Sequence, residues 1–135
     1  MASAKGPRTR PLFEELDWCV TPLGTLSLRR RAALGAGDDV YEVKLGDAFL
    51  MSSRFTVGEV ELAKRGLAAI SGERLDIVVG GLGLGHTADA VLRDDRVRSM
   101  LVVEALPEVI GWARARTAAA GRGVDWRSAL PPRPR

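Results

Sequence analysis

The first third of the chain alternates apolar and polar residues with the period of two that is typical of β-strands. The alternating runs lie at residues 18–21, 25–30, 40–45 and 48–51. Clusters of glycine, proline and aspartate separate these runs, and such residues build the tight turns between neighbouring strands. The pattern therefore predicts a small antiparallel β unit.

The apolar spacing changes to that of a helix after residue 55. Apolar residues recur mostly every three or four positions through residues 56–70, so one side of a helix formed here would be apolar. Thr56 and Glu59 have the spacing of a capping box at its start, and Ser71-Gly72 follows its end. One amphipathic helix is predicted for this segment.

Strands and helices alternate in the last part of the chain. A buried strand is predicted at residues 75–79, a second strand at 99–103, and helices at 87–92 and 106–119. This order implies parallel pairing of the two strands through a right-handed crossover. The predicted fold class is α/β, with a small N-terminal antiparallel β unit followed by an incomplete Rossmann-like βαβα sheet.

The predicted parallel sheet is unusually small. Two strands are at most half of a nucleotide-binding sheet, whose further strands normally cover the edges of the first two. We therefore expect either a partner that completes the sheet or a chain that is a fragment of a longer protein.

Composition and periodicity divide the chain into four segments. A basic segment spans residues 1–16, a β-stranded domain 17–55, a helix with a partial Rossmann-like domain 56–121, and a tail 122–135. The tail ends in Pro-Pro-Arg-Pro-Arg and has no apolar periodicity. We expect it to be disordered.

The distribution of charge argues against a nucleic-acid partner. The net charge is +3, but residues 1–10 carry three basic and no acidic side chains, and residues 122–135 carry four arginines against one aspartate. The 111 residues between these ends hold 13 basic and 16 acidic side chains. Binding to a phosphate backbone needs a basic stripe on a folded face, so we expect no nucleic-acid partner.

Membrane and metal sites are also not expected. No stretch approaches the roughly 18 unbroken apolar residues of a membrane helix, and the N-terminus lacks the apolar segment of a signal peptide. We expect a cytoplasmic protein with no membrane partner. One cysteine, Cys19, and one histidine, His86, are too few for a cysteine- or histidine-rich metal site, so no metal is expected.

The strongest chemical signal is a glycine-rich segment between the strand at 75–79 and the next helix. Its spacing is Gly81-x-Gly83-x-Gly85. Glycine suits such a loop because the chain turns sharply and a bound nucleotide or nucleoside must approach the backbone without meeting a Cβ. The third glycine of a dinucleotide motif would fall at His86. The spacing therefore favours the S-adenosylmethionine-binding, class I methyltransferase-type variant of this architecture.

Glu104 is the second candidate binding residue. It follows the strand at 99–103 and lies 19 residues beyond Gly85, close to the roughly 20-residue interval at which an acid reaches ribose hydroxyls. A carboxylate suits a ribose diol because its two oxygens can accept both O–H donors. The alternative role is that of an acid favoured by the dipole of the following helix.

Residues 75–115 resemble the adenosyl-binding segment of the spermidine synthases, the aminopropyltransferases. In that family a GGGDGG-like loop and Thr-Ala follow one strand, and the next strand ends in Val-Glu before a helix that contains Pro-Glu-Val-Ile. The matching residues are Gly81, Gly83, Gly85, Thr87-Ala88, Val103-Glu104 and Pro107-Glu108-Val109-Ile110. A weaker resemblance extends back to residue 17, where the family has a small β-stranded domain.

The resemblance implies a small adenosyl ligand as donor and a polyamine as acceptor. The donor would be S-adenosylmethionine or its decarboxylated form, bound by Gly81, Gly83, Gly85 and Glu104. Glu59 matches the acid of the family's Tyr-His-Glu stretch and would bind the polyamine, with helix capping as its alternative role. We assign no catalytic residue, because the family's later acids have no counterpart before residue 135.

One departure from the family concerns the donor. Leu84 stands where the family has an aspartate that lies near the amine of decarboxylated S-adenosylmethionine. An aliphatic side chain cannot pair with an ammonium group, so a methyltransferase that uses unmodified S-adenosylmethionine is an alternative. An alternative of another class is a non-catalytic binding module whose β-stranded front end pairs two subunits as a homodimer. The sequence leaves the activity open among these.

Overall fold

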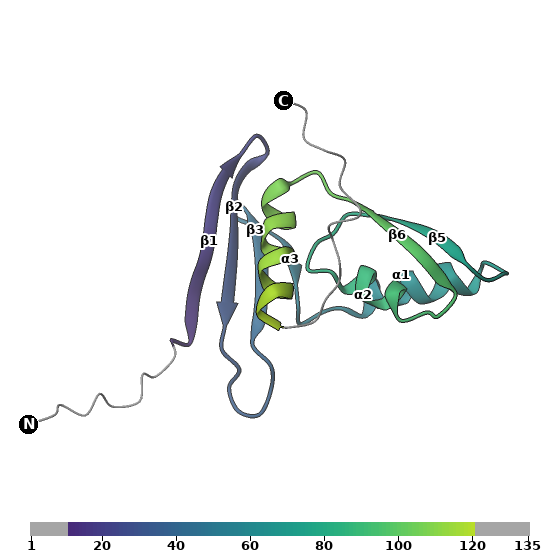
Figure 1. Cartoon of the computed structure of the whole chain (residues 1–135). Coiled ribbons are helices and arrows are strands. Elements are labelled where there is room, and N and C mark those ends of the chain that lie inside the picture. The colour runs from purple at the N-terminus through teal and green to yellow at the C-terminus, as the bar shows by residue number, and fades with distance from the viewer. Residues whose placement is uncertain (1–10, 121–135) are drawn as a thin grey trace, which may run out of the picture. The chain divides into compact units, whose positions relative to one another are not determined.

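The structure, a computed structural model, describes residues 11–120, and the chain forms two compact units, Met1–Arg54 and Phe55–Arg135. The expected disordered tail at 122–135 and the first ten residues of the expected basic segment lie outside the described residues. Figure 1 labels the strands and helices of both units.

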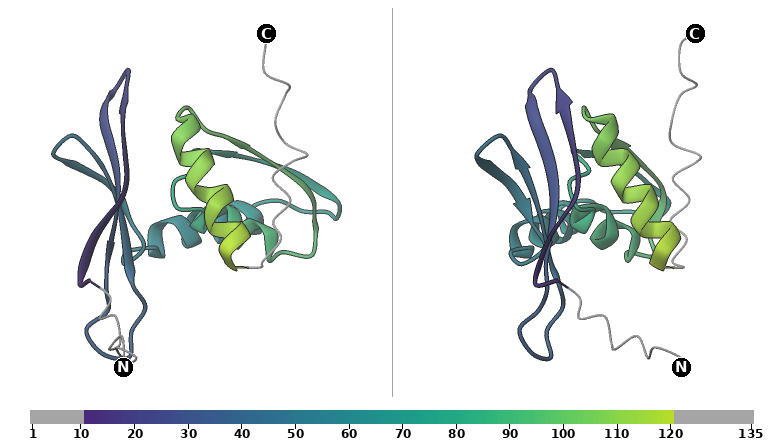
Figure 2. Two further views of the ribbon diagram at one scale, coloured as in Figure 1. Left: turned by 60° about the vertical axis from the view of Figure 1, so that its left-hand side comes forward. Right: turned by 90° about the vertical axis from the view of Figure 1, so that its left-hand side faces the viewer.

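The first unit is a four-stranded antiparallel meander. Its strands are β1 (Phe13–Thr21), β2 (Gly24–Arg31), β3 (Val40–Leu45) and β4 (Ala48–Ser52), paired in the order β1-β2-β3-β4. Figure 2 shows the hairpins of neighbouring strands from two further sides. Each alternating run of the sequence falls within one strand, so the predicted antiparallel β unit is confirmed.

Strand β1 begins at Phe13, five residues before the run expected at 18–21. Residues 13–16, expected in the basic N-terminal segment, therefore belong to the sheet. The pairing register with β2 shifts between Glu15 and Asp17. A β-bulge of this kind inserts an extra residue and interrupts the period-two pattern, which is why the sequence did not indicate a strand here.

One face of this sheet carries the buried apolar side chains of the first unit. Leu26, Leu28 and Val43 are at most 6% exposed. Leu28 and Val43 are direct partners across β2 and β3, so their side chains lie next to each other on one face. Arg30 follows in the same alternation and is only 1% exposed. A charge removed from water to this extent requires polar partners.

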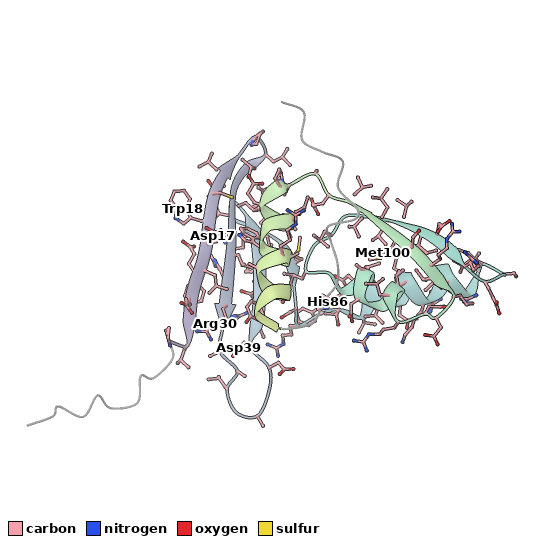
Figure 3. The ribbon with its side chains drawn as sticks, in the orientation of Figure 1. Asp17, Trp18, Arg30, Asp39, His86 and Met100 are labelled. Carbon is pink, nitrogen blue, oxygen red and sulfur yellow. The ribbon has the colours of Figure 1, made fainter. Side chains whose placement is uncertain are left out.

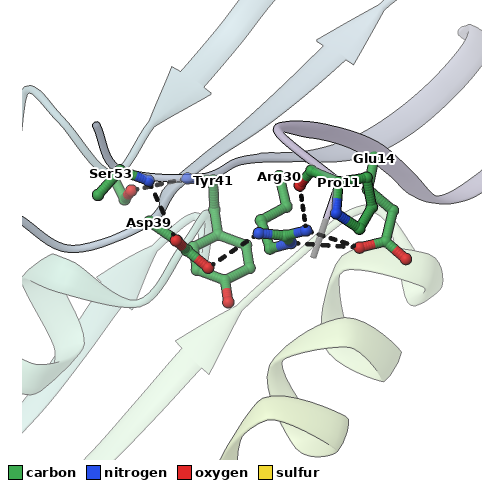
Figure 4. A network of polar contacts seen from close by, with 7 residues as sticks. Pro11, Glu14, Arg30, Asp39, Tyr41 and Ser53 are labelled. Atoms are coloured by element: carbon green, nitrogen blue, oxygen red, sulfur yellow. Dashed lines mark hydrogen bonds and ion pairs between the residues drawn. The ribbon is translucent and has the colours of Figure 1, made fainter. Parts of the chain in front are cut away.

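Three acceptors hold the guanidinium of Arg30 (Figure 4). Its Nη2 donates to Glu14 Oε2 and to the carbonyl of Pro11, both at 3.0 Å, and its Nη1 donates to Asp39 Oδ2 at 3.1 Å. The hydrogen bond to Glu14 is the main reason why the pKa of Arg30 is raised. Arg30 and Asp39 lie beside each other in Figure 3. The network ties the start of β1 and the β2–β3 loop to β2.

The second unit contains a pair of parallel strands and three helices. Its elements are α1 (Val57–Ala68), β5 (Leu75–Gly80), α2 (His86–Leu92), β6 (Val97–Val103) and α3 (Pro107–Ala120), and β5 pairs with β6 in parallel. An antiparallel sheet followed by this parallel pair confirms the predicted α/β class with a partial Rossmann-like, methyltransferase-type sheet. None of the helices within residues 11–120 is long and apolar enough to cross a membrane.

The core of the second unit lies on one face of the parallel pair. Its buried centre consists of one residue each from α1, β5 and α2, namely Ala63, Val79 and Val91. Partly buried residues of both strands pack against this centre, among them Ile77, Met100 and Val102. The intervening strand residues are 43–67% exposed; they are Val78, Leu101 and Val103. Because side chains alternate along a strand, α1 and α2 cover one face and leave these residues on the other.

Arg96 joins the end of α1 to the segment between α2 and β6. Its Nη2 donates to the carbonyl of Leu67 and its Nη1 to the carbonyl of Ile70, both at 3.0 Å. Carbonyls in the last turn of a helix lack a partner within the helix, so the guanidinium supplies a donor to the carbonyl of Leu67 and also binds that of Ile70 just beyond α1. Asp94 Oδ2 holds the same group at 2.8 Å, and this side-chain hydrogen bond lowers the pKa of Asp94.

Replacing Arg30 should destabilise the first unit, because Arg30→Met removes the guanidinium that donates to Glu14, to Asp39 Oδ2 and to the carbonyl of Pro11. We expect the unfolding temperature to fall by roughly 5 °C or more, measured by circular dichroism. Arg65→Met is the control, since Arg65 is exposed and pairs with Glu61 at the surface of α1. An equal loss in both variants would contradict a special role for the Arg30 network.

Asp94 should make the second unit sensitive to acid. Because its pKa is lowered in the fold, its stabilising contribution is complete above the unfolded value of about 3.9 and disappears as pH falls through the folded value. Asp94→Asn should lower the urea midpoint of unfolding at pH 7. Below about pH 4, the midpoint of this variant should fall less steeply with pH than that of the wild type. The control is Asp95→Asn, an exposed acid next to it. A pH profile that Asp94→Asn leaves unchanged would refute this role.

Candidate functional site

The glycine loop connects the carboxyl end of β5 to α2. Gly81, Gly83 and Gly85 have φ values of 82°, 54° and 87°, in the left-handed region that costs a residue with a Cβ about 1–2 kcal/mol. The loop reverses the chain within five residues because glycine accepts this conformation. The positions that the sequence analysis selected are therefore the ones where the backbone turn requires glycine.

Hydrogen bonds and one buried side chain hold the loop in place. The N–H of Gly81 donates to the carbonyl of Val103 at 2.8 Å, and that of Gly85 donates to the carbonyl of Leu82 at 2.9 Å. The Leu82 side chain is 7% exposed, so it anchors the loop in the core. The sequence analysis did not single out Leu82. Its position as an apolar residue between two glycines was the one feature of the sequence that could have indicated a buried anchor.

Glu104, the candidate ribose-binding residue, contacts the glycine loop through its carboxylate. Its Oε2 accepts the N–H of Leu82 at 2.8 Å, and its Oε1 accepts the N–H of Leu106 at 2.9 Å. The carboxylate thus joins the end of β6 to the glycine loop and to the residue before α3. A carboxylate can accept about four hydrogen bonds, so each oxygen retains capacity for one more donor.

The space beside the loop backbone is open. A Cβ built on Gly81 or Gly85 would meet no heavy atom within 4 Å, and the same holds for Gly80 at the end of β5. Leu84, between the last two loop glycines, is half-buried. An uncrowded backbone surface next to an anchored carboxylate can receive a flat polar molecule that carries adjacent hydroxyl groups.

Glu59 lies on α1, and the structure does not form the capping box predicted there. Thr56 precedes the helix, but its side chain makes no capping hydrogen bond. Its ψ of 1° departs from the extended backbone that aims a capping hydroxyl at the helix N–H groups. The carbonyl of Glu59 instead accepts the hydroxyl of Thr87 at 3.2 Å, which links α1 to the first turn of α2. No local pattern in the sequence indicates this contact across 28 residues.

The described residues contain no metal site that geometry would support. Within residues 11–120, no three His, Cys, Asp or Glu side chains are grouped so that they could hold a metal ion. At the glycine loop, the Glu104 carboxylate and the backbone groups can offer hydrogen bonds to a ligand.

Comparison with known proteins gives one informative result. No protein-family model and no curated protein matches the sequence. Among solved structures, the chain is similar to a crystal structure of spermidine synthase in complex with the transition-state analogue AdoDATO. The TM-score is 0.62 at 17% sequence identity, and the match covers 86% of this chain but 38% of that one. The chain therefore has a spermidine-synthase-like fold and spans less than half the length of this neighbour.

The left-handed conformation of the loop can be tested with two alanine substitutions that differ in backbone geometry alone. Gly85→Ala should cost about 1–2 kcal/mol of unfolding free energy, because alanine is strained at φ 87°. Gly80→Ala adds the same methyl group into equally open space in a strand and should change stability by less than about 0.5 kcal/mol. Urea unfolding measures both, and equal effects would contradict the left-handed turn.

Proposed function

We propose that this chain binds an adenosyl nucleoside of the S-adenosylmethionine type at the glycine loop. The observation that carries the proposal is the position of the Glu104 carboxylate, which lies against the loop and is fixed by two backbone N–H groups. A fixed carboxylate with remaining acceptor capacity suits the two hydroxyls of a ribose. Gly81, Gly83 and Gly85 leave the backbone accessible to the nucleoside beside it.

The reaction class proposed is transfer of an aminopropyl group to a polyamine, or descent from enzymes that perform it. Its support is the spermidine-synthase-like fold together with the loop and Val-Glu motifs of the sequence. Such a transfer requires an unprotonated amine in line with a carbon bound to the sulfonium. Glu59 is the residue of this chain proposed to hold an ammonium group of the acceptor. The catalytic base is left unassigned.

A methyltransferase that uses unmodified S-adenosylmethionine is the second candidate. Leu84 favours it, because its half-buried aliphatic side chain offers no charge to the amine of a decarboxylated donor. The two donors differ by one carboxylate, so their relative affinities distinguish the two candidates. A folded protein that binds neither donor would favour the non-catalytic binding module.

Calorimetric titration with S-adenosylmethionine, its decarboxylated form and methylthioadenosine tests the proposal. We expect at least one ligand to bind, and Glu104→Gln to weaken it by about tenfold or more, because an amide nitrogen cannot accept the hydrogen bonds that a carboxylate oxygen does. The free energy of unfolding of Glu104→Gln should also be about 1–2 kcal/mol lower than that of the wild type, since one backbone N–H loses its acceptor. Glu61→Gln, an acid on α1 that pairs with Lys64 and Arg65, should leave binding unchanged.

A ligand without the 2′-hydroxyl separates ribose recognition from loop support. The wild type should bind 2′-deoxy-methylthioadenosine more weakly than methylthioadenosine, whereas Glu104→Gln should discriminate little between the two. Equal discrimination in both proteins would show that Glu104 only supports the loop, and the ribose role would then be wrong.

A further inference from the structure

A side-chain hydrogen bond joins the helix that follows the glycine loop to the helix that carries Glu59. The hydroxyl of Thr87, in the first turn of α2, donates to the main-chain carbonyl of Glu59, in the first turn of α1, at 3.2 Å. A carbonyl oxygen has a second lone pair besides the one that accepts an N–H within its own helix. Thr87 therefore adds a contact between the two helices without removing one from α1.

Thr87 is tied to the glycine loop through the backbone. It lies two residues after Gly85, whose φ of 87° marks the turn from the loop into α2. The N–H of Gly85 donates to the carbonyl of Leu82 in the loop, and the carbonyl of Gly85 accepts the N–H of Asp89 in α2, both at 2.9 Å. A shift of the first turn of α2 would therefore move the last glycine of the loop as well.

The middle of α1 is held against α2 by apolar packing, and its end is held by Arg96. Ala63 and Val91 share the buried core of this unit, where α1 and α2 lie side by side (Figure 1). Apolar contact is non-directional, and packed helices can shift past each other by about 1–2 Å. A hydrogen bond is directional. The Thr87 hydroxyl thus fixes the first turn of α1 along the helix pair in a way that apolar packing does not.

The position of this turn matters because Glu59 is the residue proposed to hold an ammonium group of the acceptor. Its side chain is half-buried, and its own carbonyl is the atom that Thr87 binds. The nucleoside is proposed to bind at the loop that Thr87 follows. Transfer between two bound molecules requires their reacting atoms to be about 3–3.5 Å apart and aligned. A small shift of α1 relative to the loop would spoil that alignment.

We propose that Thr87 is a positioning residue, which holds Glu59 at a fixed distance from the glycine loop so that the acceptor amine and the adenosyl donor are aligned. The inference rests on the proposed function and adds a residue to it. In this role Thr87 acts through the main chain of Glu59 rather than on either ligand. Its effect is that of one neutral hydrogen bond, which changes an equilibrium by about two- to tenfold.

Hydrogen exchange of the ligand-free protein tests whether Thr87 holds the two helices and the loop together. Thr87→Val keeps the branched shape of the side chain and removes the hydroxyl, whereas Thr87→Ser keeps the hydroxyl. We expect the amides of Ala63 and Gly85 to exchange at least about threefold faster in Thr87→Val, and within about twofold of the wild type in Thr87→Ser. The matched control is Thr56→Val, because the hydroxyl of Thr56 stands at the start of α1 and makes no capping hydrogen bond.

Calorimetry with the diamine putrescine tests the positioning role itself. With methylthioadenosine bound, the affinity of Thr87→Val for putrescine should be at least about threefold weaker than that of the wild type, and Thr87→Ser should restore it to within about twofold. The affinity for methylthioadenosine alone should stay within about twofold in every variant. A double-mutant cycle shows whether Thr87 acts through Glu59, since Thr87→Val should then cause little further loss in the Glu59→Gln protein.

Four results would overturn the proposal. They are an unchanged exchange rate of the Gly85 amide in Thr87→Val, an unchanged putrescine affinity in that variant, an equal loss in Thr56→Val, and a loss of the same size with and without the Glu59 carboxylate. A wild type that binds no adenosyl ligand, or no putrescine with methylthioadenosine bound, would instead overturn the proposed function, and the positioning role with it. A wild type that binds both ligands while Thr87→Val has no effect overturns the positioning role alone, so the two failures are distinguishable.

Discussion

Each oxygen of the Glu104 carboxylate accepts one backbone N–H, and this single side chain joins the end of β6, the glycine loop and the residue before α3. Hydrogen bonds to a charged acceptor are stronger than those between neutral groups. A buried N–H without an acceptor is costly, so the Leu82 and Leu106 amides make the carboxylate part of the architecture. The arrangement of the loop depends on this interaction, whatever ligand the loop accepts.

This dependence changes how an acid at the end of the second strand should be interpreted. The sequence analysis set ribose binding against a role in stabilising the next helix, as if Glu104 served one or the other. In the structure the carboxylate accepts the N–H of Leu106, just before α3, and also lies at the glycine loop. A side chain held by two N–H groups loses little conformational freedom when a third donor arrives. Support of the loop and affinity for a diol are therefore compatible roles of one carboxylate.

The features that the sequence predicted are those that local patterns encode. Apolar periodicity located the strands and helices, and the interval from Gly85 to Glu104 marked the acid as a candidate ribose-binding residue. The start of β1 was missed because a bulge between Glu15 and Asp17 breaks the alternation. The capping box at Thr56 has the correct spacing but the wrong backbone angle. Contacts between distant residues, such as that of Arg96 with the end of α1, leave no periodic signal. The binding roles of the glycines, Glu59 and Glu104 stay predictions.

Strand β5 carries the glycine loop at its carboxyl end. Val79 faces the core beneath α1 and α2, whereas Val78 is exposed, so the elements within residues 11–120 pack against one face of β5. In this part of the chain β5 pairs with β6 alone, and such a strand opens its hydrogen bonds to water more easily than a central strand. The loop that leaves β5 therefore relies on contacts other than the sheet. Leu82 in the core and Glu104 just after β6 provide them, which explains why the loop is anchored by side chains rather than by strand pairing alone.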